Sequence, residues 1–213
     1  MIQIFIVDDH DMFSDGLAGL LSSQEDFAIT GTASSIAQAK IMIAGTTPDV
    51  LILDVNLLDG EGYDFHKWLL DDPKNPSPIV IYVTGDDRVF SINKAMNLGA
   101  TGYLDKTGGW KEVASAIRRG LDGKKTIGAN IATKLAEYTY SPNSASEQLT
   151  FREVEILTGI SKGRTAKEMS ADMELALPTI RTYVSRLYRK LGAKDRGHAV
   201  SLGIAKGFIG SDN

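Results

Sequence analysis

Five short apolar runs alternate with helical patterns over the first 122 residues of this 213-residue chain. The runs predict strands at residues 2–7, 28–33, 50–53, 79–83 and 102–104. The patterns between and after them predict helices at about 12–22, 36–44, 61–70, 88–98 and 110–121. Strands joined by helices form right-handed crossovers, which produce a parallel sheet covered on both faces. We therefore expect an α/β domain with a doubly wound, five-stranded parallel sheet.

Acidic, hydroxyl and basic side chains stand at the ends of these runs. Asp8 and Asp9 follow the first run and Asp54 follows the third, while Thr84 ends the fourth and Lys106 comes shortly after the fifth. The carboxyl ends of parallel strands share one edge of the sheet, where a ligand crevice opens at the reversal of strand order. Crowded carboxylates need a hard cation, and Mg²⁺ favours carboxylates, water and phosphate oxygens. The pattern predicts a Mg²⁺-dependent site for phosphoryl chemistry.

Each carboxylate has a predicted role at this site. With the strand order 2-1-3-4-5, Asp54 lies between the acidic pair and the Thr84 and Lys106 strands, so we expect it to be the nucleophile that forms an aspartyl phosphate. We expect Asp9 to bind Mg²⁺ directly, Asp8 to act through water or as a base behind it, and Asp54 and the backbone carbonyl near Asn56 to complete the ligands.

Two further side chains are expected to contact the phosphoryl group. Lys106 is predicted to pair with one phosphoryl oxygen and Thr84 to hydrogen-bond another. Taken singly, such residues are more often helix caps, turn residues or solvated surface charges, and only their joint arrangement favours function. His10 is interpreted as a loop residue, because no second histidine or nucleophile motif lies near it.

Charge is divided unevenly along the chain. Residues 1–122 carry 9 Lys and Arg against 18 Asp and Glu, a net charge of −9, whereas residues 148–213 carry 11 against 7, a net charge of +4. A positive C-terminal segment favours a polyanionic partner such as nucleic acid, and the acidic segment concentrates cations. With no cysteine, the chain has neither disulfides nor a thiolate nucleophile.

The C-terminal part shows only helical patterns, at about 151–161, 165–172, 178–191 and 196–206. The polar stretch from Thr139 to Ser146 is rich in turn formers, so we expect domains at 1–122 and 148–213. The linker at 123–147 has room for a short helix at about 129–138.

The helix at 178–191 has two faces of different chemistry. Ile180, Val184, Leu187 and Leu191 recur on one face and are expected to be buried. The opposite face carries arginines and hydroxyl side chains, which suit the major groove of DNA. Two short helices separated by a turn form a helix-turn-helix. Basic faces on helices are also often merely solvated, so composition alone does not distinguish DNA binding from a solvated face.

Four motifs follow one another in the first 122 residues: Val7-Asp8-Asp9-His10, Leu53-Asp54-Val55-Asn56, Tyr82-Val83-Thr84-Gly85 and Gly102-Tyr103-Leu104-Asp105-Lys106. With these motifs, the segment resembles the receiver domain of response regulators, which implies a flavodoxin-like fold. The resemblance implies that a histidine kinase donates the phosphoryl group to Asp54 and that Thr84 and Tyr103 reorient afterwards. This chain has Leu58 where the family usually has a proline.

Four segments stand out in the C-terminal part: residues 149–157, Ala166-Lys167-Glu168-Met169, residues 179–184 and Arg189-Lys190-Leu191-Gly192. With these segments, residues 148–209 are similar to the LuxR-type helix-turn-helix domain. The two resemblances together imply a response regulator of the NarL/FixJ type, with double-stranded promoter DNA as partner and a homodimer formed through the helix at 196–206. The DNA contacts that the resemblance implies are Lys167, Thr179, Arg181, Thr182, Ser185, Arg186 and Arg189.

The turn before the recognition helix departs from the family pattern. Glu174 and Ala176 stand where a glycine and a capping residue are common, and Pro178 precedes Thr179. Proline is accepted in a first helical turn, but an alanine side chain cannot cap one. We expect an altered helix entry, and Glu174 brings a negative charge towards DNA.

The leading hypothesis is a transcription regulator whose only catalysis is its own phosphorylation and dephosphorylation. A contact with RNA polymerase is left open. One alternative is an orphan regulator that binds DNA without phosphorylation, which Leu58 modestly favours. Another is an aspartyl-phosphate hydrolase, but Asn56 cannot supply the second acid or base that turnover needs. No apolar stretch approaches the roughly 18 residues of a membrane helix, and no signal peptide is visible, so we expect a cytoplasmic protein without membrane contact.

Overall fold

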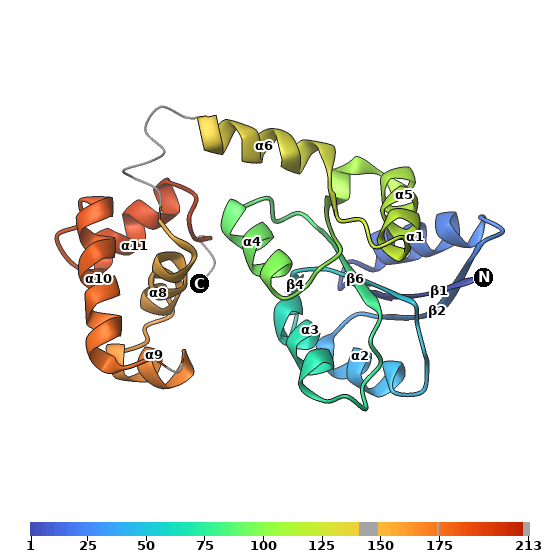
Figure 1. The fold of residues 1–213 in the computed structure, drawn as a ribbon, viewed down its shortest axis with the longest axis horizontal. Coiled ribbons are helices and arrows are strands. Elements are labelled where there is room, and N and C mark those ends of the chain that lie inside the picture. The colour runs from blue at the N-terminus through green and yellow to red at the C-terminus, as the bar shows by residue number, and fades with distance from the viewer. Residues whose placement is uncertain (141–148, 174, 211–213) are drawn as a thin grey trace. The chain divides into compact units, whose positions relative to one another are not determined.

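The computed structural model describes residues 1–140, 149–173 and 175–210, which form two compact units (Figure 1). The first unit comprises Met1–Asp87 and Ser91–Leu135, and the second comprises Arg88–Phe90 and Ala136–Asn213. No helix in the described part of the chain is both long and apolar enough to cross a membrane.

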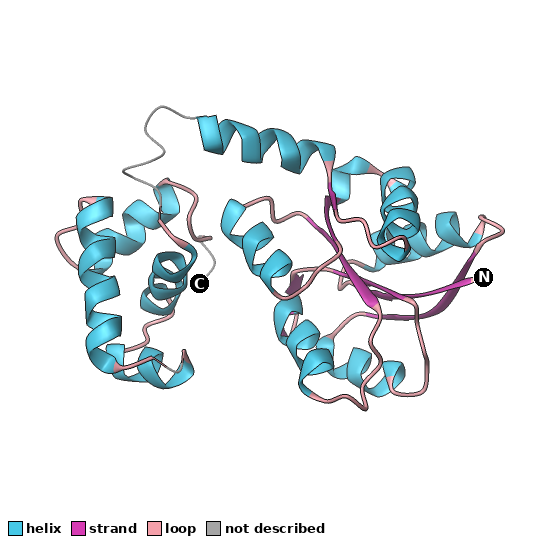
Figure 2. Ribbon diagram, viewed as in Figure 1, coloured by secondary structure: helices cyan, strands magenta, loops and turns pink. Residues whose placement is uncertain are grey.

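The first unit is built on one parallel sheet, drawn as the twisted arrows of Figure 2. Its strands are β1 (Ile2–Val7), β2 (Phe27–Ala33), β3 (Val50–Leu53), β6 (Ile79–Thr84), β7 (Gly102–Asp105) and β8 (Thr126–Ile127). Their order is β2-β1-β3-β6-β7-β8, so the doubly wound fold and the expected order of the first five strands are confirmed.

The sheet has one strand more than the expected five. β8 pairs with β7 through Thr126 and Ile127, inside the segment that we expected to be linker. Two residues are too few for an alternating pattern to be recognised, so only pairing along the exposed edge of β7 makes them a strand. A second small sheet, the hairpin of β4 (Asn56–Leu57) and β5 (Gly60–Glu61), was missed for the same reason.

Helices cover both faces of the sheet. They are α1 (Asp11–Ser22), α2 (Ile36–Ile43), α3 (Gly62–Asp71), α4 (Val89–Asn97) and α5 (Trp110–Leu121), with the 3₁₀ turn η1 (Lys106–Gly108) before α5. A sixth helix, α6 (Ala129–Tyr140), follows β8. Successive strand residues point to opposite faces. Phe5 and Val7 therefore join the core under α2, α3 and α4, whereas Ile4 and Ile6 join the core under α1 and α5.

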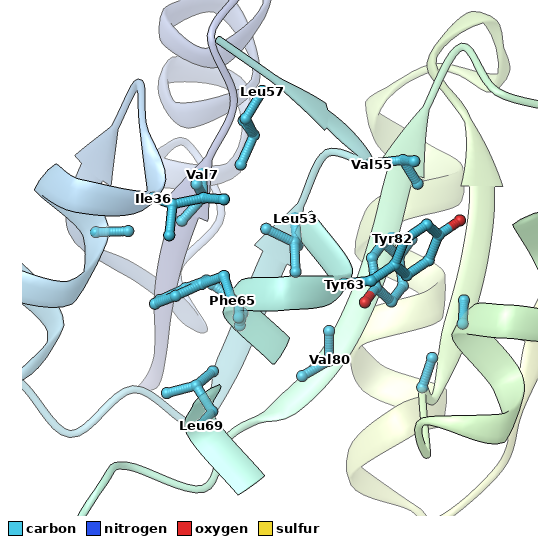
Figure 3. Packing of buried hydrophobic residues seen from close by; sticks show 14 of the residues in the cluster. Val7, Ile36, Leu53, Val55, Leu57, Tyr63, Phe65, Leu69, Val80 and Tyr82 are labelled. Carbon is cyan, nitrogen blue, oxygen red and sulfur yellow. The ribbon is translucent and has the colours of Figure 1, made fainter. Parts of the chain in front are cut away.

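Figure 3 shows the first of these cores, in which Tyr63 and Phe65 of α3 pack with Leu53 and Val80 of the sheet. These four side chains are almost fully buried. Burial on both faces explains why the strands appear in the sequence as continuous apolar runs.

The second unit is helical, as expected. It contains α8 (Phe151–Ser161), α9 (Ala166–Asp172), α10 (Leu177–Leu191) and α11 (Arg196–Ala205) around one core. Thr150 and Thr165 each form a capping box with a glutamate three residues later, which begins α8 and α9. On α10, Ile180, Leu187 and Leu191 are buried, and Val184 is half-buried against the same core.

The expected linker is only partly described. Its first half forms β8 and the beginning of α6, where Ile131 is fully buried in a core of the first unit. Residues 141–148 lie outside the described part of the chain. The domain boundaries at 122 and 148 therefore stay predictions.

Candidate functional site

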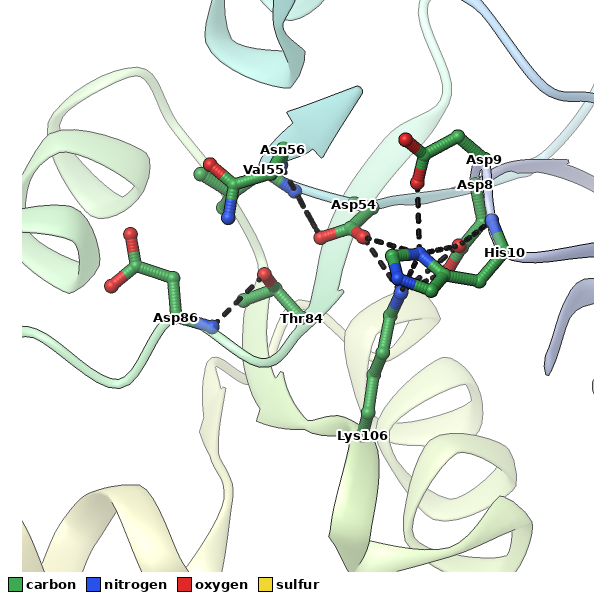
Figure 4. Close-up of polar contacts among 9 residues, drawn as sticks. All are labelled: Asp8, Asp9, His10, Asp54, Val55, Asn56, Thr84, Asp86 and Lys106. Carbon is green, nitrogen blue, oxygen red and sulfur yellow. Dashed lines mark hydrogen bonds and ion pairs between the residues drawn. The ribbon is translucent and has the colours of Figure 1, made fainter. Parts of the chain in front are cut away.

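Three aspartates and a histidine meet at the carboxyl edge of the sheet (Figure 4). Val7 of β1 pairs with Leu53 of β3, so the residues that follow these strands are neighbours. One ligand atom from each of Asp8, Asp9, His10 and Asp54 lies within 4.8 Å of all the others. These four residues are called the acidic cluster below. Asp8 and Asp54 are 3% exposed, so their mutual repulsion is little screened by water.

Lys106 enters the acidic cluster from the end of β7. Its Nζ lies 2.7 Å from Asp54 Oδ2 and 2.8 Å from Asp8 Oδ2. Burial raises the pKa of Asp8 above its usual value, and the hydrogen bond and charge of Lys106 oppose that rise. One ammonium thus balances part of the charge of three carboxylates, which leaves a local need for positive charge.

The Asp54 carboxylate is held in a fixed orientation. Oδ1 accepts hydrogen bonds from the backbone N–H of Val55 at 2.6 Å and, more weakly, of Asn56 at 3.4 Å. Oδ2 is directed at Lys106 and the acidic cluster. The structure therefore brings Asp8, Asp9, Asp54 and Lys106 together, while metal binding by the Asn56 carbonyl stays a prediction.

The acidic cluster has a donor set that fits Mg²⁺. Asp9 Oδ1 is buried and accepts no hydrogen bond within the described part of the chain. His10 Nδ1 is 2.8 Å from it, but not in hydrogen-bonding geometry. A buried carboxylate oxygen that accepts no hydrogen bond is costly unless a cation binds it. Asp8, Asp9 and Asp54 are the side chains that would hold the ion.

Thr84 and Tyr103 are linked through Asp86, which the sequence analysis missed. Thr84 is buried, and its Oγ1 accepts a hydrogen bond from the Asp86 N–H at 3.2 Å. The buried Tyr103 hydroxyl donates to the Asp86 carbonyl at 2.6 Å, and the Ser91 hydroxyl donates to Asp86 Oδ2 at 2.6 Å. In the sequence, Asp86 and Asp87 are typical of an ordinary polar loop, so no pattern indicated a role for Asp86.

The loop that follows Asp54 is anchored without the proline usual in the family. Leu58 is 83% exposed and adds no packing. Asp59 accepts hydrogen bonds from the backbone N–H groups of Ile36 and Ala37, at the start of α2. Although burial would raise the pKa of Asp59, these two hydrogen bonds hold it below its usual value. The Asp59 carboxylate fixes the tip of the β4–β5 hairpin.

The expected DNA-contacting residues of α10 share one exposed surface. A shallow, open pocket is lined by Arg181, Thr182, Ser185, Arg186 and Arg189. Thr179 and the α9 residue Lys167 are also exposed. The Thr182 hydroxyl donates to the Pro178 carbonyl at 3.0 Å, so it is partly engaged within the helix.

The entry to α10 is altered as expected. Ala176 occupies the N-cap position without a side-chain hydrogen bond, and proline lies in the first turn. The turn is held instead by Ser170, whose hydroxyl donates to the Leu175 carbonyl at 2.5 Å and whose carbonyl accepts from the Leu175 N–H. Glu174 lies outside the described residues.

Family models account for both parts of the chain. Residues 4–118 match the response regulator receiver domain, and residues 147–202 match the bacterial regulatory proteins of the luxR family. The chain belongs to the two-component response regulators.

Other response regulators resemble the chain over nearly its whole length. The transcriptional regulatory protein LiaR of Bacillus subtilis is 32% identical over 203 residues, covering 93% of this chain and 95% of LiaR. The response regulator VraR of Staphylococcus aureus is 28% identical over 199 residues, covering 93% of this chain and 94% of VraR.

A solved structure supports the same architecture. RcsB of Salmonella enterica serovar Typhimurium, bound to promoter rprA in the presence of BeF3-, has a TM-score of 0.66 at 18% identity and covers 94% of this chain and 97% of that one. At this identity the likeness shows the fold alone. The receiver and LuxR-type resemblances noted in the sequence are confirmed by the family models.

Proposed function

We propose that Asp54 of this response regulator accepts a phosphoryl group from a histidine kinase and that this transfer controls dimerisation and promoter binding. The observation that carries the proposal is the 2.7 Å contact between Lys106 Nζ and Asp54 Oδ2 inside a buried acidic cluster. A buried carboxylate that points at an ammonium, beside an acidic cluster that could hold a cation, is placed to receive an anionic group.

In the proposed transfer, Asp54 Oδ2 attacks the phosphorus of a phosphohistidine in line. The new P–O bond forms as the P–N bond breaks, and the electron pair of that bond stays on the donor imidazole nitrogen. The Val55 N–H keeps Oδ1 in place, and Lys106 moves its contact to a phosphoryl oxygen. Mg²⁺, when bound by Asp8, Asp9 and Asp54, supplies positive charge to the phosphoryl oxygens.

The proposed readout begins at Thr84. When the Thr84 hydroxyl turns towards a phosphoryl oxygen, its hydrogen bond with the Asp86 N–H is broken. Because the Asp86 carbonyl also holds the Tyr103 hydroxyl, a shift of this loop changes the surroundings of Tyr103 and, through Ser91, of α4. The chain would act on nothing but its own aspartate, and it would regulate transcription through α10.

The test is the intact mass of the full chain after incubation with acetyl phosphate and Mg²⁺. The wild type and an Asp71→Ala control, which removes an exposed carboxylate at the end of α3, should each gain one phosphate. Asp54→Ala should gain none. Size-exclusion chromatography of the same samples should show a shift towards dimer only where phosphate is gained.

Two results would count against the proposal. Phosphate incorporation into Asp54→Ala would place the acceptor elsewhere. Promoter binding and dimerisation that are equal in the wild type and in Asp54→Ala, with and without acetyl phosphate, would support the alternative of a regulator that binds DNA without phosphorylation.

A further inference from the structure

His10 lies in a loop, and its ring faces the other residues of the acidic cluster. Its Nδ1 is 2.8 Å from Asp9 Oδ1, 3.3 Å from Asp8 Oδ1 and 3.9 Å from Asp54 Oδ2. Figure 4 shows the ring turned towards these carboxylates, with Lys106 behind it. The side chain remains 66% exposed, so the ring also borders the open side of the site.

A metal binds imidazole only through a ring nitrogen that carries no proton. Lys106 Nζ lies at hydrogen-bonding distance from His10 Nδ1, 3.3 Å away. An ammonium only donates hydrogen bonds, so Nδ1 accepts in this contact when the imidazole is the tautomer with its proton on Nε2. In that tautomer the Nδ1 lone pair lies 2.8 Å from Asp9 Oδ1. His10 Nδ1 and Asp9 Oδ1 can thus both donate a lone pair to an ion bound between them.

The spacing of these atoms is that of ligands around one ion. Ligand atoms about 2.1 Å from a shared cation lie roughly 3 Å apart at a right angle, about 3.4 Å at a tetrahedral angle and about 4.2 Å when opposite. The distances from His10 Nδ1 to the three carboxylate oxygens, 2.8, 3.3 and 3.9 Å, lie close to these values.

We propose that His10 Nδ1 is a direct ligand of the divalent metal in the acidic cluster, beside Asp9, and that it gives the site a preference for Zn²⁺ or Ni²⁺ over Mg²⁺. Imidazole is a good ligand for these transition metals and a poor one for Mg²⁺, which favours oxygen. The inference rests on the metal site of the proposed function and adds a ligand and a metal class to it.

Isothermal titration of the full chain with ZnCl₂, NiCl₂ and MgCl₂, without any phosphate donor, tests the inference. His10→Ala should weaken Zn²⁺ and Ni²⁺ binding by roughly tenfold or more and change Mg²⁺ binding by less than about twofold. His198→Gln, which changes a histidine on α11 outside the acidic cluster, should bind all three ions as the wild type does. In nitrogen-15 spectra of the wild type, Zn²⁺ should shift the His10 Nδ1 resonance and leave that of His66 unchanged.

Two outcomes would overturn the inference while leaving the proposed function intact. In one, Zn²⁺ binds His10→Ala as tightly as the wild type. In the other, Mg²⁺ binds His10→Ala more tightly than the wild type, which would make the imidazole a competitor for the site. If Asp9→Asn and the wild type bind Mg²⁺ equally, the metal does not bind at the acidic cluster. The inference about His10 is then wrong as well.

Discussion

At the scale of single residues, the site depends on close backbone approaches as much as on its charged groups. Gly62 begins α3, and its N–H donates to the Val55 carbonyl at 2.7 Å. A Cβ atom at position 62 would lie 2.0 Å from the Asp54 carbonyl oxygen. The carbonyl belongs to the backbone and cannot swing away, so only glycine allows α3 to begin against Asp54.

Gly62→Ala should therefore lower the free energy of unfolding by about 1–3 kcal/mol, because overpacking forces the backbone to move. Gly16→Ala is the matched control, since it lies within α1 and a Cβ there would meet nothing within 4 Å. Alanine at that position should stabilise the helix by roughly 0.5–1 kcal/mol. Urea unfolding followed by the fluorescence of Trp68 and Trp110 measures both, and an unchanged midpoint for Gly62→Ala would contradict the packing argument.

The Tyr103 hydroxyl provides a second prediction at this scale. Tyr103→Phe leaves the Asp86 carbonyl without its buried donor and should cost about 1–3 kcal/mol. It should also uncouple phosphorylation from the shift to dimer, because Asp86 no longer connects Thr84 with the ring at position 103. Phosphate gain by mass and dimer fraction by chromatography would be compared.

Tyr82→Phe is the control, because it removes a buried tyrosine hydroxyl that contacts His66 Nδ1 instead of Asp86. It should lose comparable stability and still dimerise on phosphorylation. Equal loss of dimerisation in both variants would show that destabilisation, and not the Asp86 contact, is responsible.

At the scale of elements, Glu153 joins α8 to α10. Its Oε2 accepts hydrogen bonds from the Thr150 N–H at 2.7 Å and from Lys190 Nζ at 2.6 Å. The side chain is 3% exposed. Burial alone would raise the pKa of Glu153, but the hydrogen bonds and the charge of Lys190 hold it below the usual value. One carboxylate thus caps α8 and holds it against α10, the helix that carries most of the proposed DNA contacts.

The sign of the pH dependence follows from this lowered pKa. The stability contributed by Glu153 is present above its ordinary pKa of 4.5 and is lost as the pH falls through the lower pKa of the folded state. Glu153→Gln should reduce the free energy of unfolding of the helical unit by about 1–3 kcal/mol at pH 7. The difference from the wild type should shrink towards pH 3.

Glu155→Gln is the control, because Glu155 pairs with Arg152 on the surface of the same helix. Exposed pairs of this kind contribute about 0–1 kcal/mol, so little change is expected at any pH. Thermal unfolding followed by circular dichroism from pH 3 to pH 7 measures both variants. A Glu153→Gln deficit that does not vary with pH would contradict the assignment.

At the scale of the whole molecule, the two segments of the chain carry opposite net charges, which suit the two proposed partners, a cation and DNA. The receiver segment 1–122 has a net charge of −9 and segment 148–213 has +4. A polyanion is attracted by the second segment and repelled by the first, so the electrostatic part of DNA affinity must come from a small number of basic side chains. Those on the exposed surface of α10 are the proposed ones.

DNA affinity of the full chain should therefore fall steeply with salt. Arg189→Ala should reduce the steepness of the plot of log association constant against log NaCl concentration by about 1. The loss of affinity should be similar for DNA duplexes of different sequence. Lys74→Ala removes an exposed charge from the receiver and should leave the slope unchanged. Fluorescence anisotropy with labelled duplexes at several NaCl concentrations measures the slope, and equal slopes for Arg189→Ala and the wild type would remove Arg189 from the interface.

The sequence by itself determined the order of strands and helices and the edge at which the functional residues gather. Apolar periodicity is a local property, so the pattern placed the core strands and the helices within one or two residues of where they lie. Because parallel strands share a carboxyl edge, Asp8, Asp54 and Lys106 could be expected together from their positions at strand ends. The helical domain followed from α10, whose buried and exposed faces alternate with the helical period.

Only the tertiary structure decided how side chains are directed at that edge. The contact of Tyr103 with Asp86, the approach of Gly62 to Asp54 and the pairing of β8 with β7 join residues of different elements or loops, and none leaves a local pattern. His10 could be identified as a loop residue, but not as a member of the acidic cluster. The direction of its ring depends on carboxylates from two strands and on Lys106, 96 residues away. Such contacts depend on orientation across the sheet edge, which no sequence period encodes.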